Sequence, residues 1–216
     1  MINETLELKL KELPEIVVGR NVWQNKFHEF DVYDHTMDYV QHLKQMTSDT
    51  EMIVAGYLHD VGKPAVKKPK IKNGKLEEKA SGIPYHEFED HEIVGAEMVR
   101  KMPSEIFIEY QLNQERIANL VSAHFLPMEN IKKMRKTTDY ASFLEQYTQL
   151  ERELDSTGLL REEVMTMFLA DCLAKGKGCT DIEELKLARE AIISKDNQPL
   201  LIRLYEMQKQ MYGGKE

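Results

Sequence analysis

A histidine and an aspartate stand side by side at the end of an apolar run. The stretch from Ala55 to Pro64 reads AGYLHDVGKP, and His59 lies on the same helical stripe as Met52, Ala55 and Gly56. Imidazole and carboxylate groups are costly to bury without partners. Because both are metal ligands, the pair indicates either a metal site or a plain helix end followed by a turn.

Two further apolar stripes each end in a polar residue. In both, apolar residues at i, i+3 and i+4 are followed at i+7 by a group that should point toward the core. The stripes are Ile117, Leu120, Val121 and His124, and Val164, Met167, Phe168 and Asp171. A third helix holds His91 on the face of Val94, Gly95 and Met98, and Gly95 would let another backbone approach closely there.

His35 begins a helix whose i+3 and i+4 positions are Asp38 and Tyr39. Taken singly, each of these histidines has an alternative interpretation, a hydrogen bond to a backbone carbonyl. Four inward histidines and two aspartates would need many separate partners, whereas one or two metal ions would satisfy all of them. Since a carboxylate has two oxygens, Asp60 could bridge two ions while His59 holds one. Ligands without thiolate suit Fe, Mn, Ni, Co or Zn, with Mg less favoured.

The elements that must position these residues are helices. Apolar residues recur at helical spacing through most of the 216-residue chain and period-two alternation is nearly absent, which predicts an all-α fold. The length and the absence of an internal repeat favour a single domain over residues 1–216. The expected helices span residues 2–12, 34–47, 49–61, 89–101, 113–124, 138–154, 160–175, 181–194 and 198–212.

Residues 63–84 differ from the rest, because their lysine, proline and glycine content cannot continue a helix. Asn73-Gly74 lies between two short alternating stretches and predicts a small β-hairpin with a type I′ turn near residues 68–80. The lysines of the segment are Lys63, Lys67, Lys68, Lys70, Lys72 and Lys75. This segment is either a solvated excursion or a flap that attracts phosphate.

Composition excludes several classes of protein. A net charge of −8 argues against a whole-surface footprint for duplex nucleic acid, so an anionic ligand needs a local basic patch. Cys172 and Cys179 are too few for a disulfide framework or a thiolate zinc site. The charged, amphipathic opening and the lack of any apolar run near about 18 residues predict neither a signal peptide nor a membrane span. We expect a soluble cytoplasmic protein.

The ordered set of histidines and aspartates resembles the HD superfamily of metal-dependent phosphohydrolases. The signature of that family is a His, then His-Asp, then a distal Asp, here His35, His59-Asp60 and Asp171. LHDVGKP is similar to the HDIG variant, with Val61 where isoleucine is usual. FEDHEIVGAEM resembles the FxxHxxxGA segment of the HD domains that follow bacterial CCA-adding nucleotidyltransferases, and LVSAH fits the further histidine of a two-metal subgroup. The match runs from about residue 35 to residue 175.

The resemblance implies a helical HD bundle on which the C-terminal helices, residues 181–212, would pack. It implies one metal ion at His35, His59, Asp60 and Asp171, and a second held by His91 and His124. The implied activity is hydrolysis of a phosphoester or phosphoanhydride in a small nucleotide-like substrate, with an RNA end as a second option. The 34 residues before His35 are too few for a nucleotidyltransferase head, so we do not expect tRNA-end polymerase activity.

Asp60 and Lys63 are the expected catalytic residues. Lys63, three residues after Asp60, is placed to contact a phosphate oxygen, or else merely ends its helix favourably. His86 is one candidate acid for the leaving group, and His28 and His42 are interpreted as structural.

Two other classes stay open. One is a non-catalytic nucleotide sensor on an HD scaffold. The other is a helical interaction module in which residues 200–211, LLIRLYEMQKQM, form a homodimer surface.

Overall fold

The computed structural model of the protein describes residues 2–179 and 181–213. Within these ranges helices dominate and each named strand has two residues, so the predicted all-α class with a small hairpin is confirmed. The chain divides into two compact units. Unit 1 comprises the described residues of 1–122 and 170–180, and unit 2 those of 123–169 and 181–216. The single domain expected over residues 1–216 stays a prediction.

Unit 1 holds most of the sequence motifs. Its helices are α1 (Glu4–Lys11), α2 (Pro14–Val17), α3 (Val32–Met46), α4 (Thr50–Leu58), α5 (Lys63–Val66), α6 (His91–Lys101), α7 (Glu105–Glu109), nearly all of α8 (Gln114–Ala123) and the end of α11 (Arg161–Leu173), followed by the 3₁₀ turn η1 (Gly176–Gly178). Asp31 and Asp49 accept hydrogen bonds from backbone N–H groups in the first turns of α3 and α4, which fixes where these helices begin.

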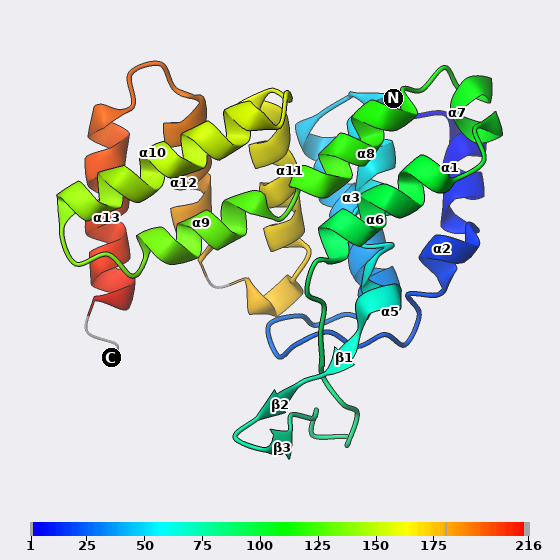
Figure 1. The fold of residues 1–216 in the computed structure, drawn as a ribbon, viewed down its shortest axis with the longest axis horizontal. Coiled ribbons are helices and arrows are strands. Elements are labelled where there is room, and N and C mark those ends of the chain that lie inside the picture. The colour runs from blue at the N-terminus through cyan, green and yellow to red at the C-terminus, as the bar shows by residue number, and fades with distance from the viewer. Residues whose placement is uncertain (1, 180, 214–216) are drawn as a thin grey trace. The chain divides into compact units, whose positions relative to one another are not determined.

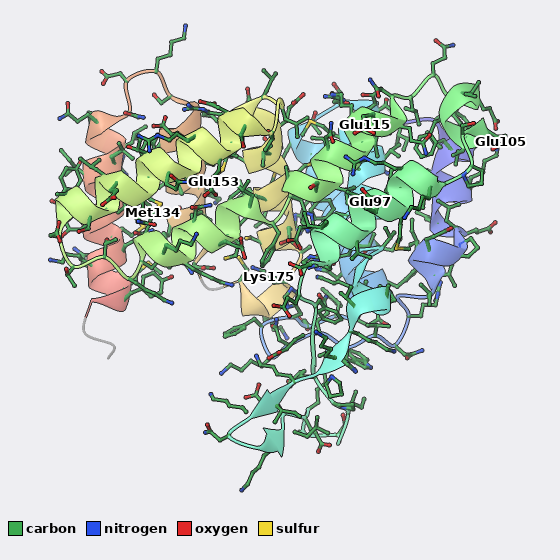
Figure 2. The ribbon with its side chains drawn as sticks, in the orientation of Figure 1. Glu97, Glu105, Glu115, Met134, Glu153 and Lys175 are labelled. Carbon is green, nitrogen blue, oxygen red and sulfur yellow. The ribbon has the colours of Figure 1, made fainter. Side chains whose placement is uncertain are left out.

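Buried stripes pack the helices of unit 1 together. On α3, His35, Tyr39 and Leu43 recur at helical spacing and are all 0% exposed. α6 and α8 lie side by side because Arg100 of α6 donates hydrogen bonds to Glu115 of α8 as well as to Glu97 of its own helix (Figures 1 and 2).

The predicted excursion leaves the helices between α5 and α6 (Figure 1). β1 (Lys68–Pro69) pairs antiparallel with β4 (His86–Glu87), and β2 (Ile71–Lys72) pairs antiparallel with β3 (Lys75–Leu76). At the tip, Asn73 and Gly74 have φ angles of 51° and 73°, as the two central residues of a type I′ turn require.

Unit 2 is built from α9 (Leu126–Met134), α10 (Tyr140–Ser156), α12 (Ile182–Ile193), α13 (Gln198–Tyr212) and the first part of α11. Asn130 of α9 donates a hydrogen bond to Glu153 of α10, which is labelled in Figure 2. Glu184 of α12 is fully buried and accepts hydrogen bonds from Arg135 and from Gln208 of α13. This buried carboxylate therefore joins the C-terminal helices to the end of α9.

Some helices were not predicted. α2, α5, α7 and α9 lie outside the expected ranges, and three of them carry a proline in the first turn, where a missing backbone N–H does no harm. α4 ends at Leu58 instead of residue 61. No helix in the described part of the chain is long and apolar enough to cross a membrane.

Candidate metal centre

The six predicted metal ligands gather into two groups of three buried residues. Within each group the ligand atoms lie within 4.8 Å of one another. The groups are His35, His59 and Asp171, and Asp60, His91 and His124. Such sets of imidazole and carboxylate ligands could hold a divalent ion, although the role of each residue as a ligand stays a prediction.

Three of the histidines are oriented in the same way. In each ring Nδ1 donates a hydrogen bond to a backbone carbonyl, which can only accept. The pairs are His35 with Ala174 at 3.0 Å, His59 with Gly56 at 2.8 Å and His91 with Phe88 at 2.8 Å. Each of the three histidines therefore has the backbone carbonyl partner that the alternative interpretation predicts, but this partner engages only Nδ1. In the neutral ring this leaves the lone pair on Nε2, as in histidines that bind metals.

The Nε2 atoms face one another and the carboxylates. Nε2 of His35 lies 3.4 Å from Nε2 of His59 and 2.9 Å from Oδ1 of Asp171. With Nδ1 carrying the proton in each ring, these contacts bring lone pairs together. Acceptors at such distances repel unless a proton or a cation lies between them. The convergence is the main physical sign of a cation site.

The carboxylate of Asp60 presents one oxygen to each group. Its Oδ2 lies 3.2 Å from Nε2 of His59 and 3.6 Å from Nε2 of His35, while its Oδ1 lies 3.5 Å from Nε2 of His91. This arrangement is the one expected of a carboxylate between two ions. The bridging role itself stays a prediction.

Two glycines let the turn that follows Asp60 approach α6 closely. A Cβ atom on Gly62 would stand 2.1 Å from the carbonyl oxygen of His91 and 2.7 Å from the backbone nitrogen of Gly95. A Cβ on Gly95 would stand 3.4 Å from the nitrogen of Gly62. The close approach expected at Gly95 is present, and it carries His91 toward Asp60.

Electrostatics set the charge states that metal ligands need. Burial alone would raise the pKa of Asp60, but the neighbouring His59 and Lys63 outweigh it and hold this pKa well below its usual range. Asp171 behaves alike, since burial is outweighed by the neighbouring His35, whose Nε2 lies 2.9 Å from Oδ1 of Asp171. Burial, followed by the charge of Lys63, lowers the pKa of His91 to about 4. At neutral pH both carboxylates are ionised and His91 is neutral.

Lys63 begins α5 and is buried beside Asp60. Its Nζ donates hydrogen bonds to Oδ2 of Asp60 at 2.6 Å and to Oε1 of Gln24 at 2.7 Å. Contact with a phosphate oxygen stays a prediction. Among the described residues, Nε2 of Gln24 has no hydrogen-bond partner, although the side chain is buried. Because Lys63 can only donate, its partner must be the amide oxygen Oε1 of Gln24, and Nε2 is the amide atom that remains.

Two other residues at the centre, Tyr39 and His28, were missed or interpreted otherwise from sequence. The ring of Tyr39 stacks on His59 with centroids 4.2 Å apart, and its buried hydroxyl has no partner within the described ranges. The ring of His28 stands edge-on to His35 at 5.3 Å, so this histidine borders the centre. Nδ1 of His86 donates to the carbonyl of Trp23. Gln24 and His28 precede α3 in irregular chain, where no periodicity could have signalled them.

A scan against family models finds the HD domain at residues 32–176. The chain belongs to the HD domain family. HD domains are generally metal-dependent hydrolases, and this one carries two groups of His and Asp side chains that could hold a divalent metal.

A curated relative of this HD domain is the A-adding tRNA nucleotidyltransferase of Deinococcus radiodurans. The two are 29% identical over 136 residues, which are 61% of this chain and 29% of the relative. The chain thus matches less than a third of the relative's length.

Proposed function

We propose that this HD domain is a metal-dependent phosphohydrolase that cleaves a phosphoester or phosphoanhydride bond of a nucleotide-like substrate. The observation that carries the proposal is the convergence of imidazole Nε2 atoms and carboxylate oxygens on shared space, with each Nδ1 already engaged by a carbonyl. The curated relative's name refers to tRNA, which supports a nucleotide-like substrate class.

The residues present fit a divalent ion. Neutral imidazole and ionised carboxylate are the forms that bind metal, and the lowered pKa values of Asp60, Asp171 and His91 provide these forms near neutral pH. Ligands of this kind favour Fe, Mn, Ni, Co or Zn over Mg. His35, His59 and Asp171 would hold one ion, and His91 and His124 a second, with Asp60 serving both.

The chemistry that divalent ions supply at such a site is a lowered pKa of water and neutralisation of charge on a phosphoryl group. The remaining work falls to the side chains. Lys63, 2.6 Å from Asp60, adds a buried positive charge that attracts a phosphoryl oxygen. Nε2 of Gln24 offers the same oxygen a hydrogen bond. In its imidazolium form, with Nδ1–H donating to the carbonyl of Trp23, His86 would protonate the leaving oxygen from Nε2–H.

The test is a panel of phosphomonoesters, phosphodiesters and nucleotides assayed with added Mn²⁺ or Ni²⁺. We expect turnover by the unmodified protein and its loss in Asp60→Ala. His42→Ala is the matched control, because His42 is a half-exposed histidine of α3 that lies 3.5 Å from Asp38 and should keep full activity. Full activity in Asp60→Ala would refute the assignment of the centre, and failure of the metal-loaded protein on the whole panel would favour the non-catalytic sensor.

A further inference from the structure

A cluster of lysines stands on the excursion between α5 and α6. Residues 67–76, here named the lysine hairpin, carry five lysines and no acidic residue in a chain of net charge −8. Of these, within the described part of the chain, only Lys68 and Lys70 have a carboxylate within 4.0 Å, at 3.6 Å from Glu89 and 3.5 Å from Glu77. Lys67, Lys72 and Lys75 are exposed and have none. The hairpin therefore carries three exposed lysines without a carboxylate of the described residues within this distance, although residues 77–90 of the same excursion include five acidic residues.

The register of the strands places like charges together. Lys72 pairs directly with Lys75, and Ile71 pairs directly with Leu76. Like charges directly opposite each other destabilise a β-ladder, so the pair is poorly suited to a hairpin that only faces water. Because side chains alternate between the two faces, the lysine pair lies on one face and the apolar pair on the other. Ile71 and Leu76 are 64% and 45% exposed. The hairpin thus offers a cationic face and an exposed apolar face.

The hairpin is rooted at the candidate metal centre. The chain leaves for it after Lys63 and returns at His91, and β1 pairs with β4 at its base. His86 of β4 is fixed to the segment that carries Gln24, since its backbone N–H donates to the carbonyl of Gln24. Gln24 in turn accepts from Lys63. The base of the hairpin is therefore joined to the segment that carries Gln24 and, through it, to Lys63, while the hairpin itself extends away from the helices of unit 1 (Figure 1).

We propose that the lysine hairpin binds the phosphate backbone of a single-stranded polynucleotide whose end is presented to the metal centre. This inference rests on the proposed phosphohydrolase function and names the substrate class. The apolar face would contact bases or sugars while the lysines contact phosphates.

Two observations favour a polymer over a mononucleotide and a single strand over a duplex. From Lys67 to Lys72 an extended chain reaches at most about 17 Å, whereas successive phosphates of a strand with stacked bases advance about 3.4 Å along the helix axis. One nucleotide would engage only part of this row. The groups of the centre are all at most 6% exposed, so a flexible end fits where a paired, stiff end does not.

The experiment compares two triple variants of the full chain. Lys67→Gln, Lys72→Gln and Lys75→Gln together remove the lysines that have no acidic partner. Lys101→Gln, Lys136→Gln and Lys186→Gln together remove the same charge from exposed positions elsewhere. Binding of fluorescent 12-nucleotide oligouridylate and oligothymidylate is followed by anisotropy over a salt series. Hydrolysis of p-nitrophenyl phosphate is measured in parallel as a substrate too small to need the hairpin.

We expect the negative slope of log K against log salt to become shallower by about 2 in the hairpin variant, since each phosphate contact on a single strand contributes about −0.7. The control variant should keep the slope of the unmodified protein, and both should keep p-nitrophenyl phosphate hydrolysis. RNA and DNA oligomers should lose binding alike, because phosphates are the shared contact. An unchanged slope in the hairpin variant, or binding to anionic vesicles without binding to either oligomer, would overturn the inference. If neither the unmodified protein nor either variant hydrolyses p-nitrophenyl phosphate, while the unmodified protein still binds the oligomers, the result would count against the phosphohydrolase proposal alone.

Discussion

Gly62 and Gly95 meet so closely that a Cβ atom on Gly62 would lie 2.7 Å from the backbone nitrogen of Gly95. Gly62 belongs to the turn after His59-Asp60, and Gly95 lies one turn after His91 on α6. The contact therefore sets the distance between the carboxylate of Asp60 and the imidazole of His91. Two glycines, which have no functional side chain, thus position two candidate metal ligands.

Gly62→Ala should push α6 away from the turn, because the new methyl group meets backbone atoms that cannot rotate aside. We expect a loss of about 1–3 kcal/mol in the free energy of unfolding, as for other overpacked sites, together with weaker metal binding. Gly95→Ala is the comparison, since its Cβ would meet its nearest atoms at 3.3–3.4 Å and should be tolerated better. Thermal unfolding with and without added Mn²⁺ measures both. Equal stability of Gly62→Ala and the unmodified protein would contradict the packing described.

Acid should weaken the attachment of α1. Glu7 of α1 accepts a hydrogen bond from Tyr57 of α4 and pairs with Lys44 of α3. Partial burial opposes ionisation, but the bonds from Lys44 and Tyr57 outweigh it and lower the pKa of Glu7 from 4.5 to about 2. A depressed carboxyl pKa adds stability above pH 4.5, and this contribution is lost as the pH falls toward 2.

The matching variant is Glu7→Gln, measured by denaturant unfolding at pH 6 and at pH 2.5. At pH 6 we expect it to be less stable than the unmodified protein by about 1 kcal/mol, given the partial exposure of the pair. The difference should shrink at pH 2.5. A difference that is the same at both pH values would show that the charge of Glu7 is not what joins the helices.

Substitution of Gln24 should affect substrate turnover more than the stability of the fold. Gln24→Met keeps the volume of this buried side chain and removes the amide donor that has no partner among the described residues. If that donor serves a phosphoryl oxygen, kcat/KM should fall about 10- to 100-fold, the value of one hydrogen bond to a charged group. The melting temperature should change little. A fall in melting temperature with kcat/KM unchanged would assign Gln24 a structural role only.

The sequence carried the information for the ligands that lie on regular helices. His124 and Asp171 were predicted because each closes an apolar stripe at i+7, and a stripe on a helix reports which face is buried. Of the excursion, the hairpin was predicted because Asn-Gly determines its turn locally. These features depend on residues close together in the chain.

Contacts between distant segments could not be predicted in this way. Gln24 lies in irregular chain and reaches Lys63 only through the fold, and no sequence pattern distinguishes Tyr39, whose ring stacks on His59, from other aromatic residues. α9 was missed because Pro127 stands near its start, where a proline is tolerated but also signals a boundary. Lys63 was expected at a phosphate, and its partners in the fold are Asp60 and Gln24.

The central claim is that the two groups of histidines and aspartates form a metal centre. Elemental analysis of protein purified without chelator tests it most directly. The same analysis is made of Asp171→Ala and of the control Asp38→Ala, which replaces a half-exposed aspartate of α3. We expect one or two transition-metal ions per chain in the unmodified protein and the control, and a clear loss in Asp171→Ala. Added metal at about 100 times its Kd should also stabilise the metal-free protein by about 2.7 kcal/mol. An unmodified protein that carries no metal, and gains no stability when Mn²⁺, Ni²⁺ or Zn²⁺ is added, would contradict the claim.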